Sequence, residues 1–469
     1  MGDPTRIAAA LMAALLAGGC GVLEPRLPEA APSTPAAWPL PATTATQAPA
    51  DARPAAEIGW REFFADPKLG EVIAQALANN RDLRVAMLNV ERARSQYRIQ
   101  RADRVPALGA VATMTRSGGD GRPVLETYTA DLGVTEFEVD LFGRVRSLSE
   151  AALQRYFAQE ENRCSAQLTL VAEVAAAYLA LAADRDQLRV AAATLHTREE
   201  SHALTEKRYE LGAVSGLDLQ LSRTQVESAR AELARYAGQV AQGANALDLL
   251  VGRPVAPELL PESLDAGMIG LDSLPAGLPS EVLLGRPDVL AAEHLLRAAN
   301  ANIGAARAAF FPSITLTGAV GYASDDLSGL FDAGTSTWAF VPQVRVPIFE
   351  GGRLRAGLGV ATADRDIALA QYEKSIQTGF REVADALALS ATLADQRAAR
   401  EATVEAAAEA DRLSRARYEA GRDSYLVQLE SQRTLYLAQQ ALIATRLAEQ
   451  VNRVALYKAI GGGWQDDGP

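Results

Sequence analysis

The chain has 469 residues and a net charge of −12, and aromatic residues make up only 6% of it. Proteins that bind nucleic acid usually carry a basic surface with aromatic side chains, so this balance argues against a nucleic-acid partner. The three histidines belong to no zinc-protease, phosphate-loop or nucleophile-elbow motif. We therefore expect no catalytic residue, no metal site and no enzymatic activity.

Residues 1–19 are predicted to be a secretory signal peptide. Arg6 precedes an apolar run from Ile7 to Leu16, and small residues follow up to Cys20. That apolar run is too short to span a bilayer as a helix. The cysteine resembles the acylated residue of a bacterial lipobox, although a plain signal peptide with an incidental cysteine is an alternative. A covalent lipid on Cys20 is the only non-protein group that we expect, and it would anchor the chain in outer-membrane lipid.

Residues 20–57 are predicted to form a lipidated tether rich in proline and alanine. Prolines recur through this stretch, so it can form neither a regular helix nor a packed core. One interpretation is that the tether lets the lipidated end of the chain reach the membrane while the folded part of the protein lies at some distance from that end. The other is a leader without a role.

The body is an internal duplication, with repeat 1 at 58–260 and repeat 2 at 261–469. The sequence Arg81-Asp82-Leu83 returns as Pro287-Asp288-Val289, 206 residues later. The segment 208–215 matches the segment 417–424 at an offset of 209. Matched landmarks in the same order indicate two copies of one structural plan.

Each repeat is predicted to contain a long helical hairpin. No proline occurs between Gly143 and Leu211, which predicts one helix of roughly 100 Å at about 1.5 Å per residue. The second repeat predicts a helix over 353–420 and a partner over 425–460. Apolar residues recur at intervals of seven, which indicates that these helices pack side by side. Gly212 and Gly421 are expected to form the turns at the two hairpin tips.

Each repeat is also predicted to contain two strands, over 108–116 and 128–141 in the first and over 313–322 and 338–348 in the second. Their alternating apolar and polar residues and their length suit a membrane barrel. A soluble sheet is the alternative. Because four strands cannot close a barrel, several copies must contribute strands to a shared one. The long helices of those copies would then form a shared helical cylinder.

Several segments resemble the outer membrane factor family of TolC-like efflux ducts, in its NodT-type lipoprotein branch. They include the runs 278–288 and 298–314, the segment 245–252, the turn 349–353, and Trp60 with Asp66-Pro67. The resemblance implies a mainly α fold with a transmembrane β-barrel. It implies a homotrimer with a 12-stranded barrel, a 12-helix periplasmic α-barrel and a mixed equatorial domain. The implied partners are a periplasmic adaptor and an inner-membrane pump of the resistance-nodulation-division (RND) type.

The same resemblance places a periplasmic gate at the hairpin tips. It implies that Tyr418, Leu426 and Glu430 narrow the periplasmic mouth. The alternative is that the charged residues are simply solvated and that the tyrosine packs within its hairpin. Charged residues available for pairing between neighbouring copies are Arg417, Asp423 and Asp218. Glu430 departs from the family, which often has aspartate there, but a ring of carboxylates would still favour cations.

Three functions are compatible with these observations. The first is the outer-membrane duct of a tripartite efflux pump for small molecules, including drugs and toxic compounds. The second is the duct of a type I protein secretion system. The third is a periplasmic helical scaffold that never forms a pore.

Overall fold

The computed structural model describes residues 23–31, 34–35, 38, 58–264, 266–270 and 280–462, and for residues 266 and 280–282 it describes the backbone alone. The predicted signal peptide and Cys20 lie outside the described residues, as does most of the predicted tether.

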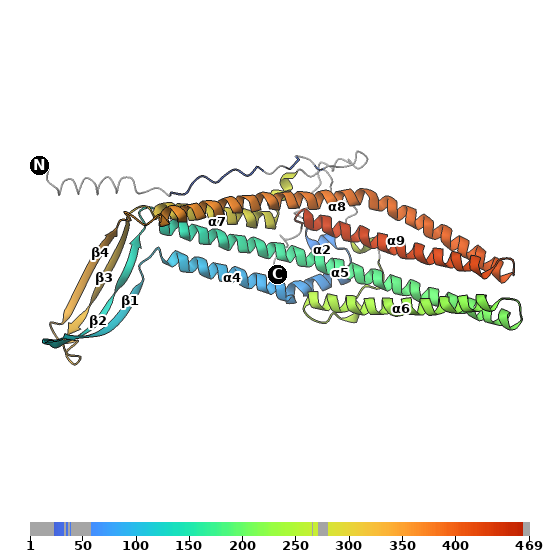
Figure 1. Cartoon of the computed structure of the whole chain (residues 1–469), viewed down its shortest axis with the longest axis horizontal. Helices are drawn as coiled ribbons and strands as arrows, with labels where there is room; N and C mark the ends of the chain where they lie inside the picture. Colours follow the sequence, from blue (N-terminus) through green and yellow to red (C-terminus); the bar gives the residue numbers. More distant parts are fainter. Residues whose placement is uncertain are drawn as a thin grey trace. The chain divides into compact units, whose positions relative to one another are not determined.

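The elements alternate between helices and paired strands in each repeat (Figure 1). The helices are α2 (Trp60–Phe63), α3 (Pro67–Asn79), α4 (Arg81–Ala102), α5 (Arg144–Glu210), α6 (Gly216–Val251), α7 (Pro287–Ala308), α8 (Arg353–Glu419) and α9 (Tyr425–Ala459). The strands are β1 (Leu108–Gly119), β2 (Arg122–Val139), β3 (Ser313–Ser324) and β4 (Ser336–Arg345). Short 3-10 turns are η2 (Pro257–Leu259), η3 (Ala266–Met268) and η4 (Ser280–Gly285).

The long helices agree with their predicted bounds to within one residue. Helices α5 and α8 each run for 67 residues, because neither contains a proline that would remove a hydrogen bond from the interior. Helix α6 begins with a capping box, in which Ser215 and Asp218 exchange side-chain and backbone hydrogen bonds. It ends at Gly252, whose φ of 78° is left-handed.

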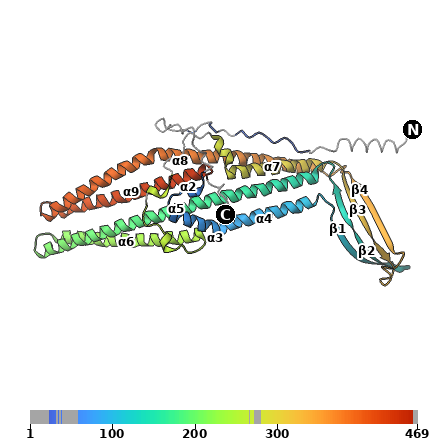
Figure 2. The same ribbon diagram turned by 180° about the vertical axis from the view of Figure 1, so that it is seen from behind.

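The four strands form one antiparallel sheet in the order β1-β2-β3-β4, as both views show (Figures 1 and 2). The central pair, β2 with β3, joins the two repeats. Side chains of β1 and β4 are exposed along the whole length of each strand. Within the described residues β1 pairs only with β2 and β4 only with β3, so both edges of the sheet are open.

The first hairpin of the sheet is longer than predicted. Gly119 pairs with Arg122, which leaves Asp120 and Gly121 as a two-residue turn. Gly121 has a φ of 77°. An Asp-Gly pair is a strong signal for such a tight turn, because glycine adopts positive φ without a steric cost. The glycines at 118–121 therefore belong to a continuous hairpin and not to the loop expected between residues 116 and 128.

The described chain forms two compact units, and each contains parts of both repeats. One unit holds the N-terminal segment up to Pro32, Met87–Asn162 and Asp288–Ser375. The other holds Ser33–Ala86, Arg163–Pro287 and Ile376–Pro469. The predicted repeat boundary between residues 260 and 261 stays a prediction.

The second unit holds the large hydrophobic core. Phe63 stacks on Tyr457 with ring centroids 4.0 Å apart, and the Tyr457 hydroxyl donates to the carbonyl of Ile58 at 2.8 Å. In the first unit a small cluster of alanines, Ala151 with Ala298 and Ala301, forms the contact of α5 with α7. Small side chains let helices approach closely. Among the described helices α5 alone is long and apolar enough to cross a bilayer, but 56% of that apolar window is buried in packing.

Candidate functional site at the hairpin tips

The two hairpin tips share one backbone geometry. Gly212 and Gly421 both have a φ of 70°, in the left-handed region that favours glycine. The amide of Ala213 donates to the carbonyl of Arg208 at 2.8 Å, and the matching bond of the second tip is 2.9 Å long. These bonds satisfy carbonyls at the ends of α5 and α8. The duplicated sequence therefore builds the same turn twice.

Tyr418 is packed between the two hairpins of the same chain. Its side chain is 2% exposed, and its hydroxyl lies 3.0 Å from the hydroxyl of Thr205 on α5. The Tyr418 ring also contacts Tyr425, and burial together with this neighbour raises the pKa of Tyr425 to about 12. The repeat equivalent, Tyr209, is 47% exposed. Matched tyrosines thus have opposite environments, and the narrowing of a shared mouth by Tyr418 stays a prediction.

Arg208, which the sequence analysis did not identify, connects the hairpins. Its guanidinium donates to the carbonyls of Tyr418 at 3.0 Å and Glu419 at 2.8 Å, and it lies over the Tyr418 ring. The last carbonyls of a helix lack intrahelical partners and carry partial negative charge, so a cation there is favourable. The alignment of the repeats contains a signal for this role. Arg208 corresponds to Arg417, but Val214 occupies the position that corresponds to Asp423, so Arg208 has no carboxylate at the equivalent place.

The other charged residues predicted at the tips are paired within the chain. Arg417 donates to both carboxylate oxygens of Asp423, at 2.6 and 2.8 Å. This ion pair lowers the pKa of Asp423. Asp218 accepts from the amide and hydroxyl of Ser215 in the cap of α6. The structure therefore brings Arg417 and Asp423 together and holds Asp218 in the other hairpin, while pairing between copies stays a prediction.

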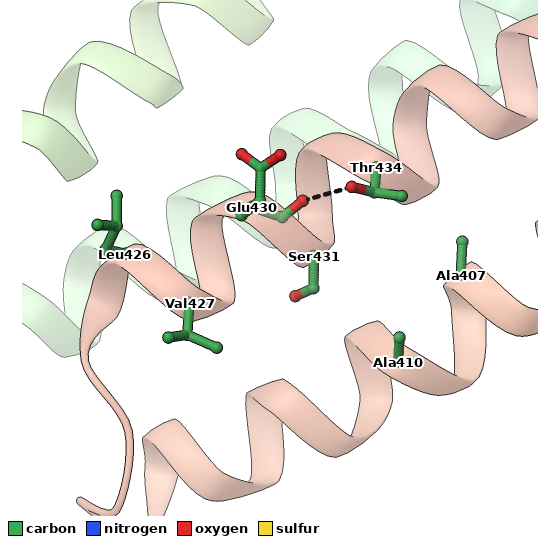
Figure 3. Close-up of a pocket in the computed structure, with 7 residues that line it drawn as sticks. All are labelled: Ala407, Ala410, Leu426, Val427, Glu430, Ser431 and Thr434. Carbon is green, nitrogen blue, oxygen red and sulfur yellow. Dashed lines mark hydrogen bonds between the residues drawn. The ribbon is translucent and has the colours of Figure 1, made fainter.

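Leu426 and Glu430 lie one turn apart on an exposed face of α9. Both side chains point away from Ala410 on α8, whereas Val427 and Ser431 face it (Figure 3). The groove between α8 and α9 has a volume of about 420 Å³ and is lined by Ala407, Ala410, Leu426, Val427, Glu430, Ser431 and Thr434. A leucine and a carboxylate on one face can form a narrow ring that attracts cations when copies surround an axis.

A buried polar layer joins α5 to α9 near the tips. Ser201 accepts from the amides of Gln428 at 3.4 Å and Gln432 at 3.3 Å. Burial lowers the pKa of the nearby Arg198, which donates to the carbonyl of Gln225 at 3.2 Å. The carbonyl oxygens of both glutamine side chains have no hydrogen-bond partner among the described residues. The layer therefore joins α5 to α9 through side-chain hydrogen bonds as well as apolar contacts.

Paired strands that alternate along the chain with long helical hairpins are typical of outer-membrane channel proteins with a helical extension. The chain belongs to the outer membrane efflux protein family, whose profile matches residues 72–253 and 278–462, one stretch in each repeat. It is therefore a component of an efflux duct and not an enzyme. The family also places it in the outer membrane, with its helices extending into the periplasm.

Relatives and a solved structure agree with this assignment. The chain is 47% identical to the toluene efflux pump outer membrane protein TtgC of Pseudomonas putida, over 97% of this chain and 94% of that protein. It is equally similar, with the same coverage, to the antibiotic efflux pump outer membrane protein ArpC of Pseudomonas putida. The open-state crystal structure of the outer membrane channel MtrE of Neisseria gonorrhoeae superposes with a TM-score of 0.86 at 39% identity, covering 95% of this chain and 99% of that one. The predicted TolC-like fold is confirmed.

Proposed function

We propose that the chain is the outer-membrane duct of a tripartite pump that exports small toxic molecules, such as aromatic solvents or antibiotics. The observation that carries this proposal is 47% identity to toluene and antibiotic efflux proteins over nearly the whole chain. The same observation favours small-molecule efflux over protein secretion and over a scaffold without a pore. The duct would receive its substrates through a periplasmic adaptor and an inner-membrane RND pump, which supply the energy and most of the selectivity.

The functional assembly would be a homotrimer. The sheet of one chain has open edges at β1 and β4, and a lipid-exposed sheet must close on itself. Pairing of β1 with β4 of the next copy removes every open edge. Three copies of a four-stranded sheet give the twelve strands that the family resemblance implies.

The periplasmic gate would lie at Leu426 and Glu430. Both side chains are exposed on one face of α9 and point away from Ala410 on α8. Tyr418 would act indirectly: its buried contact with Thr205 on α5 would fix the position of the hairpin that carries these two residues. Cys20 would carry the lipid that anchors the amino terminus, and the exposed tips would also contact the adaptor.

Single-channel recording in planar bilayers tests the gate. We expect small currents from the wild type and larger currents from Leu426→Ala and Glu430→Ala. Ser431→Ala is the matched control, because Ser431 lies on the same turn but faces α8. Equal conductance in all four proteins would rule out a constriction at this face. Failure of the wild type to insert as an oligomer would rule out the channel itself.

A cellular assay tests the pump. Deletion of the gene in its own host should raise the intracellular accumulation of a fluorescent efflux dye and reduce survival in toluene. Restoration of the intact gene should reverse both effects. Unchanged accumulation and survival after deletion would argue against export of small molecules.

A further inference from the structure

The chain shortly after Cys20 is fastened to the body of the first unit. The side-chain amide of Asn300 on α7 donates to the Glu24 carboxylate at 2.9 Å and to the Pro25 carbonyl at 2.8 Å. Asn300 is only 1% exposed, so these bonds lie in a buried contact. In both views the dark blue stretch that contains Glu24 runs beside α7 (Figures 1 and 2).

Two further bonds hold the ends of this segment. Arg307, near the end of α7, donates to the carbonyl of Leu23 at 3.2 Å. The amide of Ala31 donates to the carboxylate of Glu373 on α8, also at 3.2 Å. The contacts therefore extend over nine residues and involve two helices. We define Leu23–Ala31 as the docking segment.

Gly304 provides the space for this contact. A methyl group at Gly304 would lie 3.2 Å from the amide nitrogen of Glu24 and 3.3 Å from its Cα atom. It would also lie 2.8 Å from the hydroxyl of Ser147 on α5. Any side chain at position 304 would therefore press against the backbone of the docking segment. Asn300, Gly304 and Arg307 share one face of α7, because they are four and three residues apart.

The other repeat lacks this arrangement. At the offset of 206 residues, Asn300 corresponds to Arg94 and Gly304 corresponds to Arg98. Both arginines are exposed on α4, whereas Asn300 and Gly304 are buried. Where the amino-terminal segment contacts α7, asparagine and glycine thus occupy the positions that two exposed arginines occupy in α4.

We propose that the docking segment is a fixed mount for the amino terminus and not a free tether. Leu23 follows Cys20 by three residues in the sequence. Leu23 contacts Arg307, the penultimate residue of α7, and β3 begins at Ser313. The mount therefore holds Leu23 next to the end of α7, shortly before the chain enters β3. A lipid on Cys20, which the proposed function includes, would be attached three residues before this mount.

Limited trypsin digestion of the purified full-length protein in detergent tests the mount. The exposed Arg26 lies inside the docking segment, and mass spectrometry measures cleavage after it. We expect wild-type cleavage to be at least about tenfold slower than cleavage of a synthetic peptide of residues 21–40, because a docked segment must first detach. Asn300→Ala, Gly304→Ala and Glu24→Ala should each raise the rate toward that of the peptide.

Gly357→Ala is the matched control, because Gly357 is a helical glycine of the same unit with nothing within 4 Å of a methyl group. Its cleavage rate should equal that of the wild type. Glu24→Ala changes only the segment, so it decides the question if a substitution on α7 disturbs the body. Wild-type cleavage as fast as that of the peptide, or a Glu24→Ala rate equal to the wild-type rate, would overturn the proposal. The readout is independent of conductance and of export.

Discussion

The hydroxyl of Tyr418 on α8 lies 3.0 Å from the hydroxyl of Thr205 on α5, in a buried contact between the two hairpins of one chain. Thr205 also donates to the carbonyl of Ser201 at 2.8 Å, so it keeps a partner if the tyrosine hydroxyl is removed. We predict that Tyr418→Phe lowers the free energy of unfolding by about 1 kcal/mol, the net value of one buried hydrogen bond. Chemical denaturation in detergent measures this change.

The repeat equivalent supplies the control for that substitution. Tyr209→Phe alters an exposed side chain, so its effect should stay within about 0.5 kcal/mol. Equal effects of the two substitutions would show that the contact of Tyr418 with Thr205 does not hold the hairpins together.

Arg208 and Arg417 are repeat equivalents with different partners, and we predict different consequences of their loss. Arg208→Ala leaves the terminal carbonyls of α8 without their charged donor and should cost about 1–3 kcal/mol. Arg417→Ala breaks an exposed ion pair with Asp423, which solvent screens, so its loss should destabilise the protein less than the loss of Arg208. Unfolding midpoints of the two variants, measured side by side, check the order, and a larger loss for Arg417→Ala would contradict it.

Asp411 on α8 gives the hairpin a pH dependence. Its carboxylate accepts from the Ser431 hydroxyl at 3.2 Å, but partial burial raises its pKa. A folded pKa above the unfolded value means that the contribution of this group to stability is fully present at low pH and is lost as pH rises through the folded pKa. We predict that Asp411→Asn stabilises the protein near pH 7 by about 0.5 kcal/mol, a small value because solvent screens the group.

Thermal unfolding at two pH values measures this effect. The gain from Asp411→Asn should disappear below about pH 4, where the wild-type carboxyl is also neutral. Asp395→Asn, at an exposed position of the same helix, is the control and should give no gain at either pH. A gain from Asp411→Asn that persists in acid would argue against the burial of a charge as its cause.

Arg286 belongs to the Gly-Arg-Pro-Asp run that carries the family resemblance, and the structure gives it a role in packing. Its buried guanidinium donates to the carbonyl of Ala459 at 2.5 Å and to Glu382 at 2.8 Å. We predict that Arg286→Ala lowers stability by about 1–3 kcal/mol, because the Ala459 carbonyl and the partly exposed Glu382 carboxylate lose a charged hydrogen-bond donor. The exposed Arg253→Ala should change stability by less than about 0.5 kcal/mol. Denaturation midpoints check both, and a small effect at Arg286 would show that α9 packs without it.

Much of the fold was predictable from the sequence because its signals are local. The absence of proline allowed α5 and α8 to run for 67 residues, since an interior proline would break a helix wherever it occurred. The flanking glycines marked their ends. Gly212 and Gly421 indicated turns because left-handed backbone is a property of single residues. The Asp120-Gly121 pair is an equally local signal for a turn. The observed β1 and β2 extend to it and are therefore longer than the predicted strands.

The environments of equivalent residues were not predictable in this way. Tyr209 and Tyr418 occupy the same place in the duplicated pattern, yet only Tyr418 is buried. Arg98 and Gly304 are equivalent on α4 and α7, but only Gly304 receives another segment of the chain. The sequence by itself determined the helices, strands, turns and duplication, because these depend on neighbours along the chain. Only the tertiary structure decided which residue of each equivalent pair is buried, because burial depends on contacts between residues up to hundreds of positions apart.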